Sequence, residues 1–126
     1  VLKPAGALAI CDVEAGSPMA SWLNEFVDRH GAQGHQGQFL PAGGLAAALR
    51  AAGFVDVAET RRDVPWRFAS RPHLLRFFKG LFGLVCDEAT VAAGIDRHLR
   101  VSRVGDGIEV AWFLNYVVGR KPAATG

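Results

Sequence analysis

Apolar residues recur at three- and four-residue intervals in four stretches of the chain, which is the spacing of amphipathic helices. The first of these stretches follows Ser17, and the second covers residues 41–52. The third and fourth follow Ser70 and Asp87. Serine and aspartate are preferred at helix starts because their side chains accept hydrogen bonds from the first backbone amides. The pattern therefore predicts four helices, three of them with their own N-terminal caps.

Three further stretches predict β-strands. Residues 7–13 are apolar on both faces, which favours a buried strand in a parallel arrangement. Residues 54–62 alternate imperfectly and carry several charges, which suits an edge strand. Residues 108–118 are dense in β-forming side chains and apolar on both sides, which indicates a central strand covered on both faces. Because pairs of helices separate these strands, we expect an α/β fold with the first two strands parallel.

Size and composition narrow the class of protein. The chain has 126 residues, 50% of them hydrophobic and 21% charged, which predicts a single domain over residues 1–120 and a short tail at 121–126. The net charge of only +2 argues against a nucleic-acid partner. No apolar run is long enough for a membrane span, so we expect no membrane partner. The two cysteines form no CxxC pair, which favours a reduced, cytoplasmic chain.

Two motifs resemble the second half of a known enzyme fold. The chain begins VLKPAGALAICD, which is similar to the segment around the fifth strand of class I S-adenosylmethionine-dependent methyltransferases, where V-L-K-P-G-G precedes an apolar strand and an acid. Residues 49–57 read LRAAGFVDV and resemble that family's junction between a helix and the sixth strand. Ala5 stands where the family usually has glycine. If φ is positive there, alanine costs roughly 1 kcal/mol.

The resemblance implies the C-terminal portion of a Rossmann-like methyltransferase fold, with a three-stranded mixed sheet and about four helices. The strands at residues 7–13, 54–62 and 108–118 would correspond to the family's fifth, sixth and seventh strands. In that family the seventh strand is antiparallel and lies between the other two. Residues 66–103 would be a helical insertion, of the kind that helps to form a substrate cap.

The resemblance also implies that S-adenosylmethionine is the cofactor of the parent protein, with no cofactor-binding residue in this chain. The family holds its cofactor with a glycine-rich loop after the first strand and an acid after the second. The glycine-rich residues 31–37 follow a predicted helix, so they do not match that loop. We therefore expect half of a methyltransferase, inactive alone. The apolar edge at residues 7–13 would then be exposed, and the chain would self-associate through it.

Two histidines that flank the glycine-rich loop are candidate catalytic residues. Methyl transfer to oxygen or nitrogen often needs a base, and histidine titrates near neutral pH. His35 lies in the loop beside its glycines, which favours a solvent-facing position at a substrate site. His30 falls on the apolar stripe of the preceding helix, so it is either a second candidate base or a core histidine. The histidines and cysteines lack metal-ligand spacing, so we expect no metal site.

Four other residues are candidates for binding the substrate: Asp12, Glu14, Trp66 and Arg67. Asp12 ends the first strand and Glu14 follows it, and ligands of open α/β sheets bind beyond the carboxyl ends of the strands. Asp12 would alternatively only cap its loop. Trp66 and Arg67 place an aromatic ring beside a cation, which suits a flat or anionic acceptor but equally a packing corner.

Together these features predict a fragment of a methyltransferase that acts on a small molecule and supplies residues on the acceptor side. The alternative is a non-catalytic half-fold that dimerises and binds an apolar ligand between its phenylalanine-rich helix and the sheet.

Overall fold

The computed structural model describes residues 2–123, which divide into two compact units. The first unit is built from residues 2–15, 39–62 and 113–123. The second consists of residues 16–38 and 63–112. The first unit combines one helix, and the second several, with a three-stranded sheet, so the predicted α/β class is confirmed.

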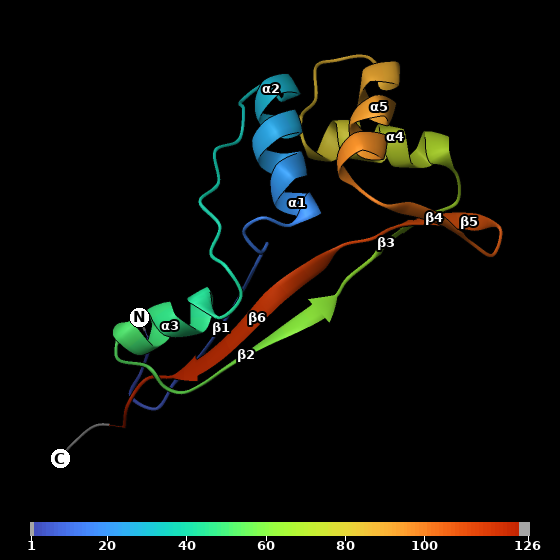
Figure 1. Ribbon diagram of the computed structural model, residues 1–126. Coiled ribbons are helices and arrows are strands. Elements are labelled where there is room, and N and C mark those ends of the chain that lie inside the picture. The colour runs from blue at the N-terminus through green and yellow to red at the C-terminus, as the bar shows by residue number, and fades with distance from the viewer. Residues whose placement is uncertain (1, 124–126) are drawn as a thin grey trace. The chain divides into compact units, whose positions relative to one another are not determined.

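The first unit holds a sheet in which the last strand of the chain is central. Its strands are β1 (Ala7–Asp12), β6 (Phe113–Arg120) and β2 (Val55–Asp63), in that spatial order. β1 pairs with β6 in antiparallel register, from Ala7 opposite Arg120 to Asp12 opposite Asn115. Figure 1 shows β2 and β6 running in opposite directions. The predicted order of the three strands, with the last one antiparallel and central, is therefore confirmed. The expected mixed sheet is wrong, because β6 runs antiparallel to both of its neighbours and no parallel pair is left among the described strands.

Helix α3 (Gly44–Ala51) packs on one face of this sheet. Ala46 and Leu49 of the helix form the buried core with Val117 of β6, and Leu8, Leu45, Phe54 and Val57 pack around them. The helix begins three residues later than predicted. Gly43 at its start has φ +82° and provides no side-chain cap.

A strand residue caps α3 instead. The carboxylate of Glu59 in β2 accepts hydrogen bonds from the backbone amides of Gly43 (2.5 Å) and Ala46 (2.9 Å). A carboxylate at this point also favours the positive end of the helix dipole. One side chain thus joins the edge strand to the start of the helix.

The prediction that residues 7–13 form a buried strand is wrong for most of its length. Val13 is buried, but Ala7, Ala9, Cys11 and Ile10 are exposed, the last to 37%. β6 is likewise covered on one face only, since Val117 is fully buried while its neighbour Val118 is 47% exposed. The physical reason is that α3 is the one helix of the first unit among residues 2–123.

Three helical regions form most of the second unit. The first is continuous through α1 (Pro18–Ser21), η1 (Trp22–Val27) and α2 (Asp28–His30), and η1 has the wider π-helical winding. The others are α4 (Arg71–Leu81) and α5 (Glu88–His98).

The predicted N-terminal caps of these three helical regions are confirmed. The side chains of Ser17, Ser70 and Asp87 accept hydrogen bonds from the backbone amides of Ala20, His73 and Thr90, respectively.

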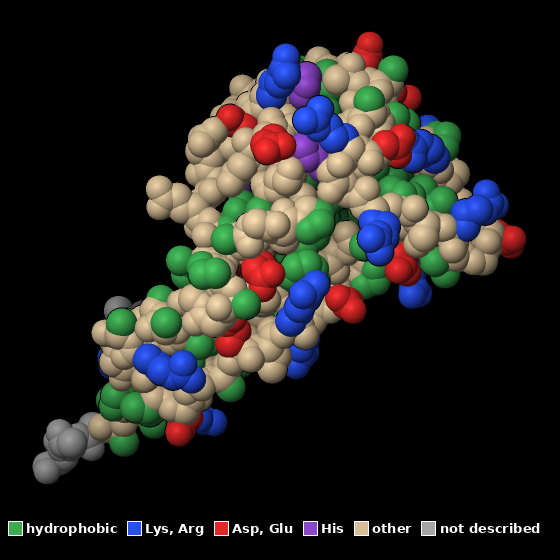
Figure 2. All heavy atoms as spheres, viewed as in Figure 1, with side chains coloured by type: hydrophobic (Ala, Val, Ile, Leu, Met, Phe, Trp, Pro, Cys, Tyr) green, Lys and Arg blue, Asp and Glu red, His purple; other side chains and the backbone are tan. Residues whose placement is uncertain are grey.

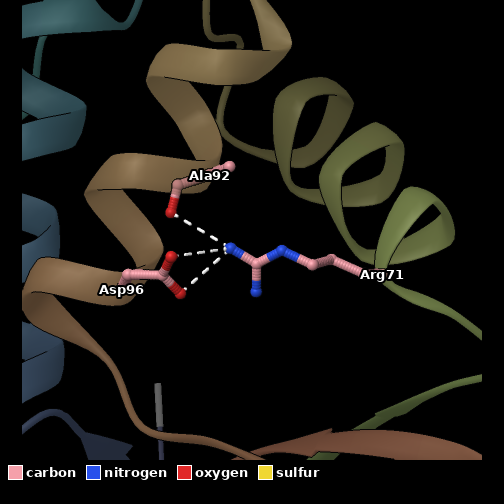
Figure 3. Close-up of polar contacts among 3 residues, drawn as sticks. All are labelled: Arg71, Ala92 and Asp96. Atoms are coloured by element: carbon pink, nitrogen blue, oxygen red, sulfur yellow. Dashed lines mark hydrogen bonds and ion pairs between the residues drawn. The ribbon is translucent and has the colours of Figure 1, made fainter.

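A salt bridge ties α4 to α5, as Figure 3 shows. Nη2 of Arg71 donates to both carboxylate oxygens of Asp96, at 3.0 and 2.9 Å, and to the carbonyl of Ala92 at 3.4 Å. Because both side chains are partly exposed, we assign this pair a positioning role and little net stability.

A second small sheet was not predicted. Its strands are β3 (Trp66–Phe68), β5 (Gly107–Val110) and β4 (Val101–Val104), with β5 central and antiparallel to both neighbours. The expected single strand over residues 108–118 is therefore wrong, because it breaks at Ala111 and Trp112 into β5 and β6. The break occurs where the buried Trp112 ring packs against Trp66, at a centroid distance of 5.9 Å.

An aromatic core holds the second unit together. Trp22 and Phe78 are fully buried, and their ring centroids lie 5.8 Å apart. Trp22 also stacks on Phe26 at 4.6 Å, and Phe78 makes an edge contact with Trp66 at 5.9 Å. The phenylalanine stripe of α4 is thus mainly core, although Phe77 remains 47% exposed.

Candidate functional site

A pocket of about 310 Å³ lies in the second unit, between the helical residues 22–30 and α5. Its lining is Glu25, Phe26, Arg29, His30, Thr90, Ala93, Gly94, Arg97 and His98. Figure 2 shows purple histidine surface flanked by blue lysine or arginine side chains and red carboxylates at the α2 and α5 end of this unit. The two walls of the pocket therefore carry positively charged, titratable and apolar side chains.

Close helix packing forms the floor of this pocket. A Cβ atom built on Gly94 of α5 would lie 2.1 Å from a ring carbon of Phe26 in η1. Only glycine fits at that position without displacement of the ring. The wider winding of η1 occurs on the same wall, and π-helical turns often occur at functional sites.

A hydrogen-bonded group orients His98 at one side of the pocket. The Ser21 hydroxyl donates to Oε2 of Glu25 (3.1 Å) and lies 2.7 Å from Nδ1 of His98. Because the hydroxyl has a single proton, Nδ1 of His98 is the donor toward Ser21. The neutral ring then accepts a proton at Nε2. This group is not a nucleophilic triad, since serine and carboxylate approach the same ring nitrogen, with Glu25 at 3.6 Å.

His30 also lines the pocket, which places one of the two predicted histidines there. Its ring lies 4.6 Å from that of Phe26, so it belongs to the apolar stripe and to the pocket wall together. The backbone carbonyl of His30 accepts a hydrogen bond from Val85, which anchors the end of α2 to the segment after α4.

His35 lies in the glycine-rich loop and is not among the residues that line the pocket. Its Nδ1 lies 2.9 Å from Oδ1 of Asn24, and its backbone amide donates to Asp28 (2.9 Å). The Asn24 amide is fixed by two hydrogen bonds with Gly37, so Oδ1 is an acceptor and Nδ1 of His35 carries the proton.

Asp12 and Glu14 lie in the first unit, where Asp12 is the last residue of β1 and Glu14 follows the strand. One carboxylate oxygen of Asp12 accepts a hydrogen bond from the next backbone amide, that of Val13, at 2.8 Å. Glu14 accepts one from the side-chain amide of the buried Asn115 in β6, at 3.2 Å. The structure therefore brings the two predicted acids to one strand end, where Asn115 is a polar partner that sequence reasoning missed.

Trp66 and Arg67 lie in β3 of the second unit and point to opposite faces of the strand. The Trp66 ring joins the aromatic core, and its buried indole N–H has no hydrogen-bond partner among the described residues. Arg67 pairs with Glu109 of the neighbouring strand at 2.9 Å. These two adjacent residues do not form one binding wall.

The sequence interpretation missed most of the pocket. The local pattern singles out none of Ser21, Glu25, Arg97 and His98 as site residues. The available signal was local: Ser21 and Glu25 stand one helical turn apart, as do Glu25 and Arg29. The pairing of these residues with α5 depends on a tertiary contact, which no local pattern shows.

Comparison with known proteins gives no relative: no family model matches the chain, and no curated protein matches it. Within residues 2–123, no group of three histidine, cysteine, aspartate or glutamate side chains could hold a metal ion. In the same part of the chain, no helix has the length and apolarity needed to cross a membrane. Cys11 and Cys86 are free thiols.

Proposed function

We propose that this chain is the acceptor-side half of a S-adenosylmethionine-dependent methyltransferase that acts on a small molecule. The single observation that carries the proposal is the strand order β1-β6-β2, with β6 antiparallel to β1. This is the order that the resemblance of the two sequence motifs implies for the last three strands of that family. A strand that joins the sheet antiparallel between two earlier strands is a specific topology, although topology alone does not define an activity.

A backbone detail of the first motif supports the same proposal. The amide of Gly6 donates to the carbonyl of Lys3 at 2.9 Å, which closes a four-residue turn. Ala5, at the third position of that turn, has φ +62°. This is the conformation for which glycine is preferred after proline in a type II turn. The chain therefore keeps the turn of the family's motif although it has lost the usual glycine.

The described residues do not fit S-adenosylmethionine itself. The glycine-rich residues 31–37 follow α2, and their backbone is held by Asn24 and Asp28. The turn from β1 into α1 contains one glycine, Gly16, and not a glycine-rich loop. We propose that the cofactor-binding residues belong to another part of the parent protein, in the cytoplasm, and that this chain alone is inactive.

The role proposed for this half is to hold the acceptor and to remove its proton. His35 and His30 are the proposed bases, and the contact of Nδ1 with Oδ1 of Asn24 fixes the orientation of the His35 ring. Asp12 and Glu14 are the proposed acceptor-binding residues of the first unit. In the second unit the proposed contact is the exposed Arg67, because the Trp66 ring lies in the aromatic core. Residues 66–103, which contain α4 and α5, are the proposed substrate cap.

The test is calorimetric titration with S-adenosylhomocysteine of two proteins, the 126-residue chain and the product of the gene that encodes it. We expect the gene to encode, in frame and upstream, a glycine-rich loop between a strand and a helix. We expect the longer product to bind the ligand and the short chain to bind none. Binding by the short chain, or the absence of such an upstream loop, would contradict the proposal.

One observation favours the non-catalytic alternative as a second candidate. An apolar pocket of about 410 Å³ lies in the first unit, lined by Leu2, Ala52, Gly53, Phe54, Lys121 and Pro122. A half-fold that dimerises along β1 would then hold its apolar ligand in this pocket, and not between the phenylalanine-rich helix α4 and the sheet, because no residue of α4 lines it. In that case the gene would lack the upstream loop, and the chain would bind an apolar dye such as anilinonaphthalene sulfonate in its dimeric state.

A further inference from the structure

We propose that the pocket between residues 22–30 and α5 binds the carboxylate of a small organic acid. The main evidence is the convergence of Arg29 from α2 and Arg97 from α5 on one cavity. These arginines come from helices far apart in the sequence, and each is followed by a histidine that lines the same pocket. The proposal does not depend on methyl transfer, since it rests on the two arginines and the apolar wall of this pocket, although His30 is also one of the proposed bases.

The two arginines are available for a ligand. Within residues 2–123, no carboxylate forms a salt bridge with Arg29 or Arg97. Glu25 is the one acidic residue that lines the pocket. Its carboxylate accepts a hydrogen bond from the Ser21 hydroxyl and lies beside Nδ1 of His98. The pocket is therefore cationic, and it becomes more so when either histidine is protonated. Arginine is well suited to carboxylates because its planar fork donates two parallel hydrogen bonds.

The size and walls of the pocket select an organic acid over a bare ion. About 310 Å³ exceeds the space that one inorganic oxyanion needs. Phe26, Ala93 and Gly94 supply an apolar wall, and Thr90 adds a hydroxyl. The charged head of the ligand would meet the arginines, while its carbon body would lie against the apolar wall.

The ring nitrogens of His98 fit this assignment. Nδ1 donates to Ser21, and Glu25 lies 3.6 Å away, so the ring is fixed on the side of η1. When protonated, Nε2 is a further donor for a carboxylate. The charged and titratable groups that face the ligand are Glu25 and Arg29 with His30 on one wall and Arg97 with His98 on the other.

The test is calorimetric titration of the 126-residue chain with benzoate, inorganic phosphate and benzyl alcohol. We expect benzoate to bind and the other two to bind at least tenfold more weakly. Arg29→Gln and Arg97→Gln should each weaken benzoate binding by about tenfold. Arg100→Gln is the matched control, because it removes the same charge from an exposed residue outside the lining. In side-chain NMR spectra, benzoate should shift the signals of His30 and His98 but not those of the exposed His73.

Three results would overturn the proposal. The first is no benzoate binding at millimolar concentration by the folded wild-type chain. The second is an Arg100→Gln effect as large as that of the lining arginines, which would show unspecific charge attraction. The third is tighter binding of phosphate than of benzoate, which would assign the pocket to inorganic oxyanions. Circular dichroism of each variant separates a loss of binding from a loss of folding.

Discussion

At the residue scale, Gly94 shows how a helix-weakening residue can be required by packing. Glycine normally destabilises a helix interior relative to alanine, so replacing it should raise stability. At Gly94 the added methyl group would meet the buried Phe26 ring at 2.1 Å. We expect Gly94→Ala to lower the free energy of unfolding by about 1–3 kcal/mol through overpacking.

The matched control is Gly80→Ala in α4, where nothing lies within 4 Å of the added carbon. We expect that variant to gain about 0.5–1 kcal/mol. Urea unfolding followed by circular dichroism measures both. Equal effects of the two substitutions would refute the close contact between η1 and α5.

Ala5 is the subject of a second prediction at the residue scale, in which the substitution raises the free energy of unfolding. Its φ of +62° is unfavourable for an L-residue with a Cβ atom and costs about 1–2 kcal/mol. Glycine removes that strain but adds flexibility to the unfolded chain, which costs about 0.4–1 kcal/mol. Ala5→Gly is therefore expected to stabilise the chain by about 0.5–1 kcal/mol in the same assay. A loss of stability would mean that this turn is not left-handed in solution.

At the scale of the element, α3 depends on a residue that lies outside it. Glu59→Ala leaves the amides of Gly43 and Ala46 without their acceptor. We expect a loss of about 1–2 kcal/mol, as for a deleted N-terminal cap. Thr60→Ala is the control, because Thr60 is exposed and points to the other face of β2. If both variants unfold at the same urea concentration, Glu59 does not cap the helix.

The cap of α5 predicts a dependence on pH. Hydrogen bonds from Thr90, first through its side chain and then through its backbone, lower the pKa of Asp87 below its ordinary value. A lowered pKa in the folded state gives stability above the unfolded-state pKa, and this stability is lost as the pH falls through the folded-state value. Thermal unfolding from neutral to acid pH should therefore show a smaller acid-induced drop in Tm for Asp87→Asn than for the wild type.

Asparagine also caps helices well, so the Tm of the Asp87→Asn variant at neutral pH should remain close to that of the wild type. Asp87→Ala removes the cap at every pH and should unfold at lower temperature throughout. An Asp87→Asn variant with the same acid dependence as the wild type would exclude Asp87 as its source.

At the scale of the whole molecule, the exposed strand β1 predicts self-association. It lies at the edge of its sheet and exposes Ala9, Ile10 and Cys11. Unpaired strand edges with apolar side chains pair with other chains unless charge or proline prevents it. We expect dimers by light scattering in reducing buffer, which excludes disulfide formation through Cys11. Ala9→Lys should shift the chain toward monomer.

The control for that experiment is Ala47→Lys on the exposed side of α3, which adds the same charge away from β1. It should leave the dimer intact. A wild-type chain that is monomeric at high concentration would contradict association through β1.

The sequence predicted the features that depend on neighbouring residues and failed where distant residues decide. The caps at Ser17, Ser70 and Asp87 are local, and all three were predicted at the right residue. No glycine or proline in the sequence marks the break at Ala111 and Trp112. The break depends instead on the burial of the Trp112 ring.

The candidate site follows the same rule. His30 could be identified from its place beside the glycine-rich loop, because that relation is local in the sequence. Arg97 and His98 could not, since their partners come from a helix far earlier in the chain. Whether a charged helix face is solvated or lines a pocket depends on what packs against it, and spacing alone carries no such information.

The division of the chain into two units has a consequence for its synthesis on the ribosome. The second unit ends at residue 112, so all of its residues emerge before β6 does. The first unit needs β6 between β1 and β2, and its sheet cannot close until residues 113–120 have been made. We infer that the helical unit folds first while β1 waits unpaired with its apolar side chains exposed. A ribosome that stalls shortly after residue 112 would therefore display a folded unit together with an aggregation-prone strand.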